Sequence, residues 1–153
     1  MASTSAVKGS DVILTITGDF AVAEKLLALS SKAQMKTACN KALGAGAKIV
    51  NRAARVRIRE RTKRRTGRLR VGTEITRIVA TRQGNWKRRV QLKGREFFGI
   101  EGKQEYYPAI VEYGHDKAPG KHFMRDAHRD TKTEVTAAIE TALADYVNKQ
   151  AGT

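Results

Sequence analysis

The fold is decided by residues 33–61, AQMKTACNKALGAGAKIVNRAARVRIRER. Small and apolar side chains recur along this stretch at steps of three and four residues, which is the spacing of one face of an α-helix. The pattern predicts a long helix from about Ala33 to Arg61. Alanine predominates and Gly44 and Gly46 lie in the same stretch, so we expect another element to pack closely against it. The predicted apolar stripe comprises Met35, Ala38, Cys39, Ala42, Leu43, Ala45, Ile49, Val50, Ala53 and Val56.

Upstream of this helix the sequence predicts one strand and one short helix. Residues 12–17, VILTIT, are apolar or β-branched and end at Gly18, which is typical of a strand. Asp19 can cap a short helix over Phe20–Leu29. Residues 1–10 are small and polar, without the apolar core of a secretion signal. We therefore expect a flexible N-terminus and synthesis in the cytoplasm.

Downstream, the hydrophobic period changes from that of a helix to that of a strand. Side chains alternate between two faces over residues 71–81, with Ile75 and Val79 expected on the same face. A turn follows at residues 83–85, and residues 86–92 alternate again. This pattern predicts an antiparallel β-hairpin. Residues 95–100 are interpreted as a third strand or a loop.

The C-terminal part of the chain predicts two helices. Residues 107–113 predict a short one, with Pro108 tolerated in its first turn. Residues 115–121, like residues 63–70, are expected to be flexible. From His122 to about Lys149 the apolar residues return to helical spacing. We therefore predict one α+β domain over residues 1–153, with a small, mostly antiparallel sheet packed by a long helix and a C-terminal helix.

The charge of the chain is large and unevenly distributed. Thirty Lys and Arg residues oppose 15 Asp and Glu residues, which leaves a formal net charge of +15. Between Arg52 and Arg70 there are ten basic residues and one acid, Glu60. Such a run repels itself unless a polyanion or an acidic partner offsets it, and cations of this kind contact phosphates without reading sequence. The candidate phosphate contacts are Arg52, Arg55, Arg59, Lys63, Arg64, Arg65, Arg68 and Arg70.

Few residues have the spacing of catalytic or metal-binding groups. His115, His122 and His128 match no common ligand pattern, and the single cysteine, Cys39, is expected to be a small buried thiol. No paired carboxylates, nucleophile elbow or phosphate-binding glycine loop is present in the sequence. No apolar run has the length of a membrane span. We expect no catalytic residue, no metal, no cofactor and no membrane partner.

Glu112 is the best-placed single acid in the chain. It follows the apolar pair Ile110-Val111 and precedes Tyr113-Gly114. Because no catalytic partner is evident, we expect its carboxylate to be structural and to pair with an arginine, within the subunit or across a subunit boundary. The candidate structural or subunit-interface residues are Glu112, Tyr113, Phe123, Met124 and Arg125.

Two motifs, in order, resemble a family of small phage proteins. The first is Thr66-Gly67-Arg68-Leu69-Arg70, and the second joins Glu112-Tyr113-Gly114 to Phe123-Met124-Arg125-Asp126-Ala127 across a loop. Phage neck and tail-completion proteins carry a Thr-Gly-Arg-Leu-Arg element followed by Glu-Phe-Gly-Thr and Pro-Phe-Leu-Arg-Pro-Ala. This chain has His115, His122 and Asp126 where that pattern has Thr and the two Pro residues.

The resemblance implies a structural role in the virion. It implies an α+β subunit that forms a ring, expected to be a hexamer, at the head-proximal end of the tail. Its partners would be further copies of itself, the tail tube protein and the head connector or stopper proteins, with double-stranded DNA passing through the lumen. Such a tail-completion or tail-terminator protein is not an enzyme. The alternative kept open is a sequence-nonspecific nucleic-acid-binding protein of nucleoid type, with a small nuclease in third place.

Overall fold

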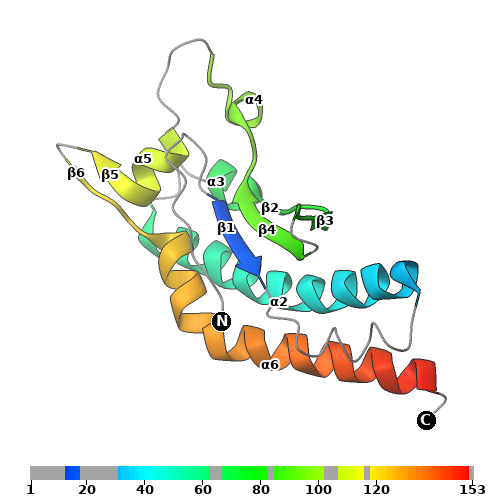
Figure 1. Ribbon diagram of the computed structural model, residues 1–153. Helices are drawn as coiled ribbons and strands as arrows, with labels where there is room; N and C mark the ends of the chain where they lie inside the picture. Colours follow the sequence, from blue (N-terminus) through cyan, green and yellow to red (C-terminus); the bar gives the residue numbers. More distant parts are fainter. Residues whose placement is uncertain are drawn as a thin grey trace.

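Figure 1 shows the computed structural model, which describes residues 13–17, 31–62, 67–82, 85–101, 107–115 and 118–151. The expected α+β architecture is confirmed, with helices exceeding a small antiparallel sheet. The helix expected over Phe20–Leu29 lies outside the described residues, as does the expected flexible segment 1–10. The described elements are β1 (Ile13–Thr17), α2 (Lys32–Arg61), α3 (Gly67–Val71), β2 (Thr73–Ile75), β3 (Val79–Ala80), β4 (Trp86–Leu92), α4 (Arg95–Phe98), α5 (Tyr107–Tyr113), β5 (Gly114–His115), β6 (Ala118–Pro119) and α6 (Phe123–Ala151).

Helix α2 is the central element, with the sheet on one side and α6 on the other (Figure 1). It begins at a capping box, in which the Ser31 hydroxyl accepts the Gln34 N–H and the Gln34 side chain accepts the Ser31 N–H. Burial on two sides makes its apolar surface wider than the single predicted stripe. Ala47, Ala54 and Ile58 lie outside that stripe and are also fully or almost fully buried, whereas Val56 within it is 43% exposed.

Helices α2 and α6 run antiparallel and approach each other closely. Arg57 contacts Asp130 near one end of the pair, and the Gln34 amide contacts Gln150 near the other. At Gly46, a Cβ atom would lie 3.0 Å from the nearest Val135 side-chain atom and 3.1 Å from Ile139. The predicted close packing is therefore confirmed, since Gly46 leaves the space that two α6 side chains occupy.

Strand β4 is the centre of the sheet. It pairs antiparallel with β1 on one side and with β2 and β3 on the other. The predicted hairpin is present, but its first strand is not continuous. Ile75 is opposite Val90 and Val79 is opposite Lys87, so three residues on one strand face two on the other. This one-residue bulge reverses the alternation of side chains, and Val79 is 52% exposed rather than on the buried face with Ile75.

Two segments expected to lack helices are helical. Residues 67–70, part of the segment expected to be flexible, form α3 together with Val71, which was expected in a strand, and α3 buries Leu69 completely. Residues 95–98, expected as a strand or a loop, form the short helix α4. This turn buries Phe98, whose ring stands edge-on to Tyr107 at 5.5 Å. Burial of an aromatic ring thus decides the conformation where local spacing was ambiguous.

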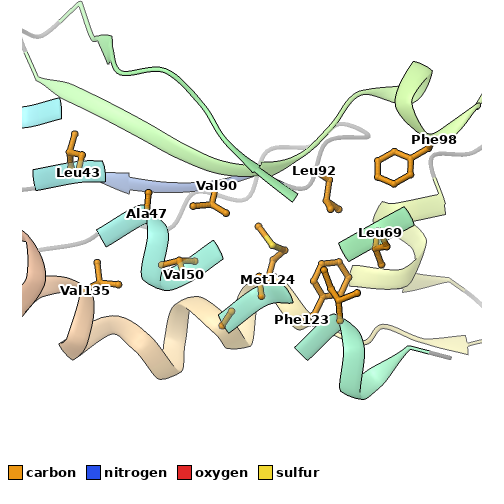
Figure 2. Close-up of a cluster of buried hydrophobic side chains, with 13 residues drawn as sticks. Leu43, Ala47, Val50, Leu69, Val90, Leu92, Phe98, Phe123, Met124 and Val135 are labelled. Atoms are coloured by element: carbon orange, nitrogen blue, oxygen red, sulfur yellow. The ribbon is translucent and has the colours of Figure 1, made fainter. Parts of the chain in front are cut away.

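The main core lies where α2, β4, α3 and the start of α6 meet (Figure 2). Phe123 and Met124 enter it from the first turn of α6 and are almost completely buried. A second, smaller cluster joins α2 to the C-terminal half of α6 and comprises Ala38, Ala42, Leu143 and Tyr146. Cys39 is a buried free thiol, as expected, and burial raises its pKa.

Candidate functional site

The second sequence motif builds the entry to helix α6. Helix α5 ends at Tyr113, the chain turns through the short hairpin of β5 and β6, and α6 begins at Phe123. Within the loop predicted for residues 115–121, the structure thus places the paired residues His115 and Ala118–Pro119. Backbone N–H groups of Lys121 and His122 donate to the carbonyls of Val111 and Glu112, which fixes the end of the hairpin against α5.

The Glu112 side chain caps the N-terminus of α6. One carboxylate oxygen accepts the backbone N–H of Met124 at 3.0 Å, and the other accepts that of Arg125 at 2.9 Å. These N–H groups belong to the first turn of the helix, where no carbonyl within the helix is available to accept them. A carboxylate at this position also lies at the positive end of the helix dipole. Glu112, at the end of α5, therefore supplies a cap for the first turn of α6.

The structural role predicted for Glu112 fits this geometry, but the predicted partner was wrong. Its carboxylate oxygens bond to backbone N–H groups rather than to an arginine side chain, because the hairpin brings the start of α6 directly over α5. The residue is 1% exposed. Burial raises the pKa of Glu112 above its ordinary value, opposed by the two backbone hydrogen bonds and by nearby His122 and Arg125.

The other candidate interface residues divide into buried and exposed groups. Phe123 and Met124 belong to the core of the subunit, so their position fits the structural role rather than the interface role. Tyr113 is 52% exposed, and the Arg125 side chain is 60% exposed. Tyr113 and Arg125 thus remain available to a neighbouring molecule, whereas Glu112, Phe123 and Met124 act within the subunit.

The basic run of α2 is split between two faces of the helix. Arg57 and Arg61 point toward α6, where Arg57 contacts Asp130 at 2.5 Å and Arg61 contacts Asp126 at 2.6 Å. Arg57 and Arg61 are four positions apart on α2, and Asp126 and Asp130 are four positions apart on α6. Because the two helices are antiparallel, Arg57 lies beside Asp130 and Arg61 lies beside Asp126. Two of the ten cations in the basic run are therefore offset by acidic residues of the same subunit.

Another face of α2 carries exposed cations. Arg52, Arg55 and Arg59 are exposed, and Lys41 and Lys48 continue the same face toward the N-terminus, where the Lys41 ammonium lies 5.1 Å from the centre of the Tyr146 ring of α6. The Arg55 guanidinium donates to the hydroxyl and carbonyl oxygens of Thr73 at 2.8 and 2.9 Å. We call Lys41, Lys48, Arg52, Arg55 and Arg59 the α2 cationic face. The sequence prediction omitted the two lysines, although their spacing of eleven and four residues before Arg52 would have placed them on it.

The remaining candidate phosphate contacts lie beyond α2. Arg68 and Arg70 are exposed on α3. Lys63, Arg64 and Arg65 lie outside the described residues. The structure therefore brings Arg52, Arg55 and Arg59 together on one helical face and places Arg68 and Arg70 on a separate short helix.

A groove of about 320 Å³ lies between α2 and α6. Its polar lining mixes cations and acids: Arg52, Arg57, Glu60 and Glu134. Arg57 is already paired with Asp130, and Ile49, Ala53 and Val56 supply the apolar part. The hydroxyl in the lining belongs to Thr131, and it donates to the Ala127 carbonyl oxygen at 2.7 Å.

The described residues contain neither a metal-binding cluster nor a membrane-spanning helix. No group of three His, Cys, Asp or Glu side chains comes together there in a way that could hold a metal ion. Within the same residues, none of the helices is both long and apolar enough to cross a membrane. Comparison of the chain with protein-family models, with curated proteins and with solved structures found no match.

The contact between Arg61 and Asp126 should make stability depend on pH. The hydrogen bond from Arg61 holds the pKa of Asp126 below its ordinary value of 3.8, and the Asp126 side chain is 11% exposed. A lowered folded-state pKa contributes stability above pH 3.8 that is lost as the pH falls through the folded-state value. Asp126→Asn should cost about 1.5–3 kcal/mol at neutral pH, nearer the lower figure because Arg61 is partly exposed.

Urea denaturation of the wild type and Asp126→Asn over a pH series measures this effect. The difference in their free energies of unfolding should shrink to near zero once Asp126 is protonated in both states. Asp145→Asn, on the exposed surface of the same helix, is the matched control and should change stability little. A constant difference between the wild type and Asp126→Asn from neutral to acidic pH would contradict an ionic role for Asp126.

Proposed function

We propose that this chain is a non-enzymatic structural virion protein that completes the head-proximal end of a phage tail. In this proposal its subunits form a ring, expected to be a hexamer, between the tail tube and the head connector. Double-stranded DNA passes through the ring. The protein would thus be a tail-completion or tail-terminator subunit that is made in the host cytoplasm and ends in the neck of the virion.

The observation that carries the proposal is the second motif, whose Glu, Gly and Phe each have a physical role in this fold. Glu112 caps α6, Gly114 adopts a φ of 86°, and Phe123 enters the core. A motif of this kind specifies a subunit architecture rather than an active site, which supports a structural protein. Asp126 stands where the phage pattern has Pro, and its carboxylate accepts a hydrogen bond from Arg61.

The charge distribution supports a DNA channel in this proposal. The α2 cationic face presents exposed positive charge to solvent, while the two arginines that face α6 are neutralised within the subunit. Lys and Arg side chains contact phosphates without reading sequence.

A head–tail joining assay tests the proposal. Tails assembled without this protein should fail to join DNA-filled heads, and addition of the purified protein should restore joined particles. Glu112→Ala should restore fewer, because the start of α6 would be destabilised. Tails that join heads equally well with and without the protein would contradict the proposal.

One observation favours the alternative of a nucleoid-type protein. The α2 cationic face would attract any duplex, whether or not the protein forms a ring. The two functions differ in what the isolated subunit does. A nucleoid protein binds free DNA tightly as a subunit, whereas a neck protein should bind it weakly because DNA must move through the ring. Tight binding by a subunit that does not associate with tails would favour the alternative.

A further inference from the structure

The α2 cationic face has a geometry that the sequence run alone did not define. Its five residues are separated by seven, four, three and four positions, so they follow one line along the helix. The line extends over about 27 Å at 1.5 Å per residue. That length corresponds to about eight base pairs of duplex at 3.4 Å each. The surface is therefore long enough to follow several phosphates along one DNA strand.

Helix α2 itself contributes a single acid, Glu60. It lines the groove that faces α6, together with Arg52 of the line. Arg57 and Arg61, which belong to the same basic run, are engaged by Asp130 and Asp126. The structure thus neutralises Arg57 and Arg61 within the helix pair, whereas Lys48, Arg52, Arg55 and Arg59 stay exposed and are not paired with an acid in the contacts described above.

One member of the line is fixed in position. The Arg55 guanidinium uses its Nε and one Nη2 hydrogen to bind Thr73, at the edge of the sheet. A guanidinium has five N–H donors, so three remain for an anion. A side chain held in this way loses less entropy when it binds a phosphate than a free arginine does.

From these observations we infer that the α2 cationic face is the surface that contacts the phosphates of double-stranded DNA, and that Arg57 and Arg61 do not take part. The inference rests on the proposed function, since it takes the DNA of the lumen as the polyanion. Duplex is favoured over single strands because the line contains no aromatic side chain on which bases could stack. Binding through this surface is independent of sequence and sensitive to salt.

The test uses the full chain and two variants that each lose three positive charges. The first carries Lys48→Gln, Arg52→Gln and Arg59→Gln, which spares Lys41 over the Tyr146 ring and Arg55 on Thr73. The matched control carries Lys121→Gln, Lys132→Gln and Lys149→Gln, at positions outside α2. Affinity for two unrelated duplexes is measured over a range of salt concentrations, beginning at low salt. Thermal unfolding shows that each variant is folded.

The first variant should reduce the magnitude of the log–log salt slope by about 0.9 for each phosphate contact that it removes, or up to about 2.7 in all, equally for both duplexes. The control should keep nearly the wild-type slope. A third variant with Arg52→Lys and Arg59→Lys keeps the charge and should also keep the slope. An equal reduction in the first variant and the control would overturn the inference, because binding would then reflect net charge alone. So would a wild type that binds no duplex at low salt.

The same measurements separate this inference from the proposed function. If the chain neither forms a ring nor joins tails, yet only the first variant shows a reduced slope, the proposed function fails and the DNA surface stands. If the chain joins heads to tails and both triple variants bind DNA alike, the proposed function stands and the assignment of the surface fails.

Discussion

Replacing Glu112 with alanine should lower the free energy of unfolding by on the order of 3 kcal/mol or more. The substitution removes the acceptor for two backbone N–H groups, those of Met124 and Arg125, at a position that is 1% exposed. Each buried donor left without an acceptor costs about 1–3 kcal/mol, and removal of the side chain leaves a space beside the core. Chemical denaturation followed by circular dichroism measures the change.

Two further substitutions make the Glu112 experiment specific. Glu112→Gln keeps the shape and one acceptor oxygen but presents an NH₂ group to the other N–H, so its stability should lie between those of the wild type and the alanine variant. Glu140→Ala, at an exposed position on α6, should change stability by less than about 0.5 kcal/mol. If Glu112→Ala were as stable as Glu140→Ala, the carboxylate would not be holding the helix start.

The second large effect is expected at Gly114, the glycine of the same motif. Its φ is 86°, which costs a residue with a side chain about 1–2 kcal/mol. A Cβ atom there would also lie 2.5 Å from the Gly120 nitrogen and 2.7 Å from the Ala118 carbonyl oxygen. These are backbone atoms on the facing side of the hairpin, so a rotamer change cannot relieve the contact. Gly114→Ala should therefore cost about 3 kcal/mol or more and loosen the start of α6.

Gly67 provides the control for Gly114. A Cβ atom on Gly67 would meet no other atom within 4 Å, and its φ is not positive. Gly67→Ala should be neutral or slightly stabilising, because alanine favours the helix α3 that begins there. Amide hydrogen exchange of α6 in the Gly114 variant should increase at its first turn. Equal stability of the Gly114 and Gly67 variants would show that the hairpin is not a constraint on α6.

Local spacing was sufficient to predict the long elements. Helix α2 was predicted to within one residue at its start, and α5 was predicted with the bounds observed. In both, apolar residues at helical spacing coincide with a cap or with a proline in the first turn. The same information could not predict the bulge after Ile75, because a single unpaired residue is defined only by the register with β4.

The sequence predicted which residues belong to the candidate site better than it predicted the contacts that they make. The sequence identified Glu112 as structural but suggested an arginine as its partner, since backbone N–H groups carry no signal in a sequence. It identified the basic run from Arg52 to Arg70. It could not show that Asp126 and Asp130 neutralise Arg57 and Arg61, because that contact depends on how α6 packs against α2.

Electron micrographs of the purified protein, alone and mixed with tail tubes, test the central claim most directly. The proposed function predicts a closed ring, seen either in the protein alone at assembly concentrations or only at one end of the tube. Because such subunits can remain monomeric until they meet the tail, a monomer in isolation agrees with the account if rings appear on the tubes. A protein that stays monomeric and also leaves the tube ends bare would contradict it.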